Sequence, residues 1–326
     1  MQYIILKVFN EVIITTDITT IGEVLIDLTQ TGVNAQNVPM LAANPGGAPA
    51  NVAVAAARLG AQTAFCGKVG RDGFGSYLSQ VLQENGVDVS GLRTSKTPTT
   101  MAVVTLSQEG ERSFRFVRGA DAEFSPEEID VCSLANSKVL HFGSVSLTAG
   151  AARSATIFAA RQARQQGVLV SYDPNYREAL WESEEEAVEW MRNPLPLVDV
   201  IKLSEEELPL LTGTADPEAA SQHLEDLGVK LVLITMGEKG AFYRWQGATG
   251  LVPGVATTVA DTNGAGDTFL GAALSRLTAR GDHPLESLTV EELERVLTFA
   301  NRAASITCSR SGAIPAMPTL DELEEE

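Results

Sequence analysis

The chain has 326 residues, of which 44% are hydrophobic and 20% charged, and its formal net charge is −18. This composition suits one large α/β domain with a small appendage. It disfavours nucleic-acid binding, because the sequence lacks the clustered Lys and Arg that displace counterions from phosphate. No apolar run approaches the roughly 20 residues that cross a bilayer, so we expect no membrane partner.

The N-terminus and the cysteines bear on location. Residues 3–14 are apolar but include Lys7 and Glu11 and lack a small-residue cleavage site, so we do not expect a signal peptide. The three cysteines are far apart in sequence, which indicates neither a disulfide framework nor a zinc knuckle. We therefore expect a cytoplasmic protein.

Strand-like and helix-like segments alternate along the chain. A first strand is predicted over Thr20–Ile26, with Asp27 at its end. This alternation predicts a doubly wound, mostly parallel α/β sheet flanked by helices, with ligands beyond the carboxyl ends of its strands. Further strands are expected at 62–69, 138–142, 168–172, 198–203 and 231–235, and helices at 75–83, 151–166 and 216–227.

Two segments, 28–43 and 97–118, interrupt this alternation because neither has a helix signal. The second contains two β-rich runs, 100–106 and 113–117, around the turn at 108–111, which is typical of a hairpin. We expect both segments to form a small sheet outside the main domain.

The most informative motif is Asp-Thr-Asn-Gly-Ala-Gly-Asp-Thr at residues 261–268, which precedes a helical pattern over 269–277. Gly264, Ala265 and Gly266 would then lie at a helix N-terminus, where unpaired amides and the helix dipole bind anions. Asp267 would be placed to accept a proton from an attacking hydroxyl while the amides hold a phosphate. The alternative is a glycine-rich turn with an acidic helix start, which the dipole also favours.

A second glycine motif, residues 45–51, precedes an Ala-rich helical run that ends at Gly60. Gly46 and Gly47 permit close contact with a ligand, and Asn51 offers the donor and acceptor that sugar hydroxyls need. Asp27 would be a second hydroxyl acceptor. The alternative is a plain turn with Asn51 as a helix cap.

Together the two motifs resemble the signatures of the ribokinase-like, or pfkB, carbohydrate kinases. The resemblance covers about residues 19–320, leaves 1–18 as an extension of uncertain structure, and implies that segments 28–43 and 97–118 form a β-sheet lid. Three further stretches carry it: 173–177 with Leu180-Trp181, similar to fructokinases and 2-keto-3-deoxygluconate kinases; 235–240, similar to the nucleotide loop; and 299–301 with 312–315, similar to the purine-pocket region.

The resemblance implies a role for each matching residue. Asp267 would be the catalytic base, and Gly264, Ala265 and Gly266 the anion hole. The implied sugar contacts are Asp27, Gly46, Gly47, Asn51, Phe116, Arg118 and Arg177, and the implied nucleotide contacts are Ser204, Thr235, Gly237, Gly240 and Asn301.

The resemblance also implies ATP and Mg²⁺ as cofactors. Glu207 would hold Mg²⁺ indirectly, in a Ser-Glu-Glu-Glu stretch where many relatives have Asn-x-x-Glu. A monovalent cation such as K⁺ is expected at Asp261, Asn263 and Gly312. A homodimer formed through the lid is expected as well.

We predict that the chain phosphorylates fructose to fructose 6-phosphate. Another acceptor, such as 2-keto-3-deoxygluconate, ribose or a nucleoside, stays open, because Arg118 and Arg177 would also suit a keto acid. A catalytically silent regulatory member of the family is the alternative from a different class, although the undamaged motif at 261–268 argues against it.

Overall fold

The computed structural model describes residues 16–106, 112–148 and 150–324. Its main sheet has ten strands in the order β14-β13-β12-β11-β10-β9-β1-β4-β5, with β6 paired to β4. All neighbouring strands pair in parallel except at one edge, where β13 pairs antiparallel with both β12 and β14. The strands are β1 (Thr16–Ile21), β4 (Thr63–Gly70), β5 (Val87–Asp88), β6 (Leu92–Ser95), β9 (Ser137–Gly143), β10 (Leu169–Asp173), β11 (Val200–Ser204), β12 (Leu231–Thr235), β13 (Gly240–Trp245) and β14 (Ala248–Pro253).

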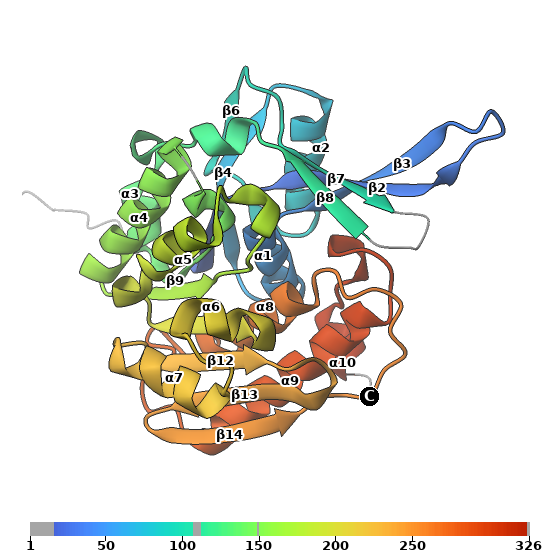
Figure 1. Cartoon of the computed structure of the whole chain (residues 1–326). Helices are drawn as coiled ribbons and strands as arrows, with labels where there is room; N and C mark the ends of the chain where they lie inside the picture. The colour runs from blue at the N-terminus through green and yellow to red at the C-terminus, as the bar shows by residue number, and fades with distance from the viewer. Residues whose placement is uncertain (1–15, 107–111, 149, 325–326) are drawn as a thin grey trace, which may run out of the picture.

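Helices cover both faces of this sheet, as predicted (Figure 1). On one face, Ile18 of β1 packs with residues of α1 and α8; on the other, Ile21 packs with residues of α4. None of the described helices is both long and apolar enough to cross a membrane. The helices are α1 (Ala48–Arg58), α2 (Gly73–Glu84), α3 (Val131–Ala135), α4 (Gly150–Gln165), α5 (Glu184–Arg192), α6 (Leu208–Thr212), α7 (Pro217–Asp226), α8 (Ala265–Thr278), α9 (Val290–Cys308) and α10 (Leu320–Glu324).

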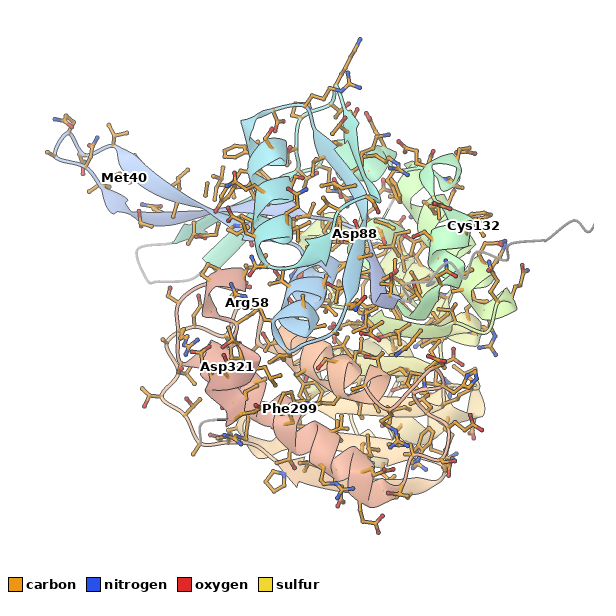
Figure 2. All side chains as sticks on the ribbon, turned by 180° about the vertical axis from the view of Figure 1, so that it is seen from behind. Met40, Arg58, Asp88, Cys132, Phe299 and Asp321 are labelled. Atoms are coloured by element: carbon orange, nitrogen blue, oxygen red, sulfur yellow. The ribbon has the colours of Figure 1, made fainter. Side chains whose placement is uncertain are left out.

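A second, small sheet stands apart from the main one. It has the order β3-β2-β7-β8, and β2 and β3 project from the body as an arm that carries Met40 near its outer end (Figures 1 and 2). The predicted hairpin is confirmed, since β7 and β8 pair antiparallel, although its turn at 108–111 lies outside the described residues. The strands are β2 (Leu25–Val33), β3 (Pro39–Gly46), β7 (Met101–Leu106) and β8 (Arg112–Val117).

The first predicted strand, Thr20–Ile26, is wrong. β1 ends at Ile21, and β2 begins a new direction at Leu25. Gly22 between them has φ 148°, and a Cβ there would lie 2.7 Å from Cγ of Pro49, so the bend requires glycine. Asp27 therefore lies in the small sheet. At the other end, β1 already begins within the predicted extension, and residues 1–15 lie outside the described ones.

Candidate active site

The carboxyl ends of three neighbouring parallel strands bring together motifs that are far apart in sequence. β10 ends at Asp173, β11 at Ser204 and β12 at Thr235. Segments 173–177, 204–207 and 235–240 thus meet at one edge of the main sheet, which is where open α/β sheets bind ligands.

The start of α8 has the geometry of an anion site. Gly264, at the N-cap position, has φ 75°, and a Cβ there would lie 2.9 Å from Cβ of Ala313. Glycine has no side chain to cap the helix, and the amide of Ala265 donates to the carbonyl oxygen of Thr262 at 3.3 Å, so the amides that follow it in the first turn are the ones left to meet a ligand. These amides and the helix dipole favour a phosphate at Gly264–Gly266, the predicted anion hole.

Asp267 lies in the first turn of α8 and is only 6% exposed. Its Oδ2 accepts a hydrogen bond of 2.8 Å from Nδ2 of Asn51, on α1, and its Oδ1 accepts one of 3.1 Å from Nδ2 of Asn175. Burial raises the pKa of Asp267, while Asn51 and nearby cations oppose the shift. The two amides therefore fix the orientation of a carboxylate that has an increased affinity for protons.

Asp27 lies in the same neighbourhood. Burial raises its pKa to about 6, with Arg177 opposing and Asp267 adding to the shift, so all three side chains act on one another electrostatically. Gly46 faces this carboxylate: a Cβ there would lie 2.3 Å from Oδ2 of Asp27. Glycine at position 46 thus leaves room for Asp27 beside the loop that leads into α1.

The three predicted sugar contacts that carry long side chains differ in their surroundings. Arg177 is exposed, and its Nη1 donates to the carbonyl oxygen of Tyr176 at 3.0 Å. Arg118 instead donates to Oγ1 of Thr148 at 2.7 Å and forms an ion pair with Asp121, which ties it to the main domain. Phe116 is half-buried on β8.

Lys202 is a residue of this site that the sequence analysis missed. Its ammonium lies 3.0 Å from Oδ2 of Asp173, and both side chains are buried. A Cβ on Gly266 would lie 2.9 Å from Nζ of Lys202, so this cation lies directly beneath the first turn of α8. Burial lowers the pKa of Lys202, but Asp173, Glu207 and Asp267 outweigh burial and raise it overall, so Lys202 stays charged.

In the predicted nucleotide site, the side chains of Glu207 and Thr235 form hydrogen bonds with backbone groups. Glu207 accepts hydrogen bonds from the amides of Tyr176 at 2.7 Å and Ser204 at 2.8 Å, which joins two strand ends. Thr235 donates to the carbonyl oxygen of Leu203 at 3.2 Å. Each Glu207 oxygen keeps a second lone pair, which fits an indirect, water-mediated contact with a metal.

Further predicted nucleotide contacts lie in the turn between β12 and β13 and on α9. Gly237 and Gly240 have φ of 57° and 105°, and a Cβ on Gly240 would lie 2.1 Å from the carbonyl oxygen of Val252. Asn301 donates from Nδ2 to the carbonyl oxygens of Val252 and Pro253, at 3.1 Å and 3.0 Å. Asn301 thus anchors the end of β14 beside this loop.

The predicted monovalent-cation residues lie together. The carboxylate of Asp261 accepts hydrogen bonds from the amides of Asn263 at 3.0 Å and Gly312 at 3.2 Å. Within the described residues, no three His, Cys, Asp or Glu side chains form a metal-binding group. Backbone carbonyl oxygens would therefore have to supply most ligands for a cation here.

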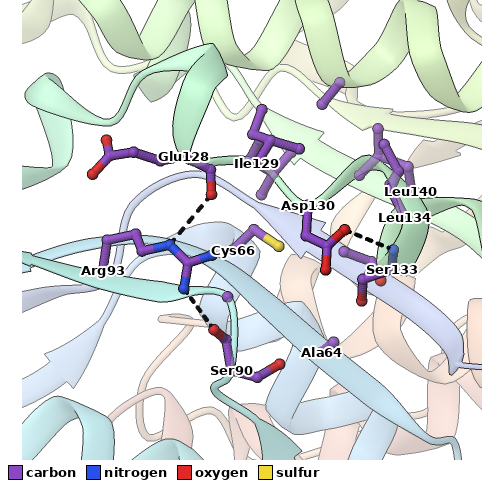
Figure 3. A pocket seen from close by; sticks show the side chains of 14 residues that line it. Ala64, Cys66, Ser90, Arg93, Glu128, Ile129, Asp130, Ser133, Leu134 and Leu140 are labelled. Carbon is purple, nitrogen blue, oxygen red and sulfur yellow. Dashed lines mark hydrogen bonds between the residues drawn. The ribbon is translucent and has the colours of Figure 1, made fainter.

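A separate cavity of about 110 Å³ lies on the α4 side of the sheet (Figure 3). It is lined by Cys66, Arg93, Asp130 and mainly apolar side chains. Arg93 donates to the carbonyl oxygens of Ser90 and Glu128, and Asp130 caps α3. It contains none of the predicted site residues.

Residues 15–320 match the pfkB family carbohydrate kinases. The chain is 42% identical over 309 residues to probable fructokinase-2 of Arabidopsis thaliana, with 93% of each chain covered. It is similar to the structure of a fructokinase from Xylella fastidiosa with bound ATP (TM-score 0.88, 35% identity, 95% and 97% covered). It is also similar to a double mutant of fructokinase from Vibrio cholerae O395 in a form with bound fructose, ADP and potassium ion (TM-score 0.83, 34% identity, 95% and 98% covered).

These similarities span the main sheet, the small sheet and the segments that meet at the start of α8, because they cover nearly the whole chain. They confirm the predicted ribokinase-like fold and phosphotransferase class. The chain belongs to the pfkB family of carbohydrate kinases.

Proposed function

We propose that the chain transfers the γ-phosphate of ATP to fructose and yields fructose 6-phosphate. The observation that carries this proposal is the placement of Asp267 in the first turn of α8, oriented by Asn51 and Asn175 and close enough to Asp27 to act on its pKa. A base, an anion site and a hydroxyl acceptor thus share one edge of the sheet. The relatives named fructokinase support fructose as the acceptor.

Asp267 acts as the general base in this proposal. The 6-hydroxyl of fructose gives its proton to Asp267 as its oxygen attacks the γ-phosphorus, and the bond from that phosphorus to the oxygen of ADP breaks. A carboxyl with a raised pKa accepts a proton more readily, and each Asp267 oxygen keeps a lone pair beside its amide hydrogen bond.

The negative charge on the transferring phosphoryl group is stabilised from the protein side. In this proposal the phosphoryl group lies at the helix start formed by Gly264–Gly266, where the helix dipole favours an anion, and Lys202 adds a buried positive charge beneath the same turn. The chain as a whole has a net charge of −18, which repels the negatively charged ATP. The positive charge of Lys202 opposes this repulsion at the site.

The sugar is bound by groups around Asp267. Asp27 accepts hydrogen bonds from hydroxyls, and Asn51 still has a buried Oδ1 without a partner among the described residues, which a sugar hydroxyl can satisfy. Arg177 and Phe116 complete the sugar site, and the small sheet closes over it as a lid that excludes water.

Mg²⁺ and K⁺ are the metal ions of this proposal. Glu207 would hold Mg²⁺ through water, and the ion would neutralise charge on the phosphates of ATP. Asp261, Asn263 and Gly312 would hold K⁺. Bound ATP and potassium ion in the solved relatives support the nucleotide and the monovalent cation.

The small sheet also provides a surface for a second copy of the chain. Its arm exposes four large apolar side chains, which would lie buried if two arms packed together in a homodimer. These residues are Val33, Val38, Met40 and Leu41.

The absence of a disulfide among Cys66, Cys132 and Cys308 supports a reducing, cytoplasmic setting.

The test is an ADP-release assay with fructose, ribose, 2-keto-3-deoxygluconate and a nucleoside as acceptors. We expect fructose to give the highest kcat/KM. A strong preference for the keto acid would replace fructose as the substrate, and no ADP release with any acceptor would favour the regulatory alternative.

A further inference from the structure

A buried polar cluster lies where the small sheet joins the main domain. The chain passes between the two sheets at four crossings, and Thr100 links two of them. Its carbonyl oxygen accepts from the amide of Ile26 at 3.1 Å, and its Oγ1 accepts from the amide of Gly119 at 2.6 Å. Any movement of the small sheet relative to the main domain must therefore alter the contacts in this cluster. The four crossings are 22–24 before β2, 47–48 after β3, 99–100 before β7 and 118–119 after β8.

Glu23 is one of the two buried carboxylates of this cluster, the other being Asp121, and is 2% exposed. Its Oε1 accepts a hydrogen bond of 3.0 Å from the amide of Ala48, and its carbonyl oxygen would lie 2.6 Å from a Cβ on Gly47. Glu23 thus holds the loop that carries Gly46 and Gly47 from two sides. Its Oε2 is buried and has no hydrogen-bond partner among the described residues.

Arg118 supplies the complementary group. Its Nη1 donates to Thr148, and its Nη2 forms an ion pair with Asp121 at 2.8 Å. Nε and Nη2 are both buried without a hydrogen bond in the described part of the chain, and Nε has no ion pair there either. Arg118 lowers the pKa of Glu23, and Asp121 raises it, so both lie near enough to act on this carboxyl. An unmatched acceptor on Glu23 and an unmatched donor, Nε of Arg118, therefore belong to one buried cluster and carry opposite charges.

We propose that Glu23 is a positioning residue that couples the small sheet to the sugar loop, its Oε2 accepting a hydrogen bond from Nε of Arg118 when the small sheet closes over the acceptor. The proposal rests on the proposed sugar kinase function. Buried polar groups that stay unpaired disfavour the arrangement that contains them, so the closed arrangement, which pairs both, gains stability. Because Oε1 holds Ala48, this movement reaches Gly46 and Gly47.

The protonation of Glu23 supports the same coupling. Burial raises its pKa to about 7, and the charged groups that act on it are Asp121, which adds to the shift, and Arg118, which opposes it. A protonated carboxyl is a weaker acceptor for a guanidinium donor. Closure should therefore weaken as the pH falls below about 7, and the KM for fructose should rise.

The test compares the wild-type chain with Glu23→Gln, which keeps an oxygen for Ala48 but loses the charge. We expect the KM for fructose to rise about tenfold, the KM for ATP to stay within about twofold, and the pH dependence of the fructose KM near neutrality to disappear. The matched control is Glu292→Gln, since Glu292 likewise accepts from a helix-start amide, that of Thr289 at 3.0 Å, but lies on α9. This control should leave both KM values unchanged.

A double variant tests the pairing itself. Arg118→Lys keeps the charge but lacks Nε, so Glu23→Gln combined with Arg118→Lys should raise the fructose KM no more than the worse single variant. Fully additive effects, or a Glu23→Gln variant with the wild-type KM and pH profile, would overturn the proposal.

Hydrogen exchange of the chain with fructose bound and ATP absent gives a readout independent of turnover. Glu23→Gln should increase exchange in strands β2 and β3 relative to the wild type and to Glu292→Gln under these conditions, because the closed arrangement loses its charged pairing with Arg118. Unchanged exchange would count against the coupling. A wild-type chain that binds sugar and ATP but does not phosphorylate fructose would instead refute the proposed function.

Discussion

Asn51 donates a hydrogen bond of 2.8 Å from Nδ2 to Oδ2 of Asp267, and the two residues are 216 positions apart in sequence. This contact joins the two glycine motifs, one at the start of α1 and the other at the start of α8. It places the proposed sugar-contact loop and the proposed base at one point, so that a hydroxyl bound by the first motif could be deprotonated by the second.

Replacing Asp267 by Asn should lower kcat by about 1,000-fold, because the carboxamide cannot accept the hydroxyl proton. The carboxamide has nearly the same size as the carboxylate but can accept from only one of the two amides of Asn51 and Asn175, so the variant should still fold, with a modest drop in its thermal unfolding midpoint. Steady-state ADP release and circular dichroism melting measure the two quantities. A folded variant with near-normal kcat would refute the role of Asp267 as base.

Replacing Gly266 by Ala should displace the ammonium of Lys202, because the new Cβ would lie 2.9 Å from Nζ. Because Nζ is the end of a flexible side chain, it can move aside, so we expect a reduced kcat and a change of less than about 1 kcal/mol in the free energy of unfolding. Gly73→Ala is the matched control: Gly73 also opens a helix, α2, and a Cβ there meets nothing within 4 Å. Steady-state ADP release by both variants measures kcat, and an equal kcat in the two would contradict the close approach of Lys202 to Gly266.

Replacing Lys202 by Met should cost about 3–5 kcal/mol of stability, because it leaves the buried carboxylate of Asp173 without its partner. Adding Asp173→Asn removes that unpaired charge and should restore most of the stability. The kcat of the double variant should nevertheless stay at least about 10-fold low, since the positive charge beneath α8 is still missing. Recovery of both properties would show that Lys202 has only a structural role.

The ionisation of Asp27 should make the stability depend on pH. Burial raises the pKa of Asp27 from 3.8 to about 6, so between these values the folded chain binds more protons than the unfolded one. The free energy of unfolding contributed by this group therefore falls as the pH rises from about 4 to about 6.

Asp27→Asn should remove this contribution. Other buried carboxyls with raised pKa values, such as Glu23, titrate with the same sign, so the difference between wild type and variant isolates Asp27. Urea unfolding across this pH range measures it. A constant difference between the two chains would contradict the raised pKa.

Local patterns predicted much of the fold and part of the site. Helical spacing after Gly266 placed a helix start beside Asp267, and α8 begins at Ala265. Short apolar runs predicted the parallel strands, and β12 spans the predicted residues, Leu231–Thr235. These features depend on neighbours in sequence, through periodicity and through the turn preferences of glycine.

Where the chain bends sharply, local patterns were insufficient. The strand-like run at 20–26 looks continuous, yet it contains the crossing from the main to the small sheet, at Gly22, which approaches Pro49 of α1 closely. The position of Asp27 in β2 therefore depended on a contact between distant parts of the chain.

The sequence by itself determined the alternation of strands and helices, the helix start at 264–267 and the identity of the proposed base. Only the tertiary structure decided which side chains surround that base. Lys202 looks like an isolated charge in an apolar strand, and it meets Asp173 and Gly266 because β10 and β11 lie side by side beneath α8. The physical reason is that hydrophobic periodicity is a local property, whereas the pairing of buried charges depends on strand register and helix packing between segments far apart in the chain.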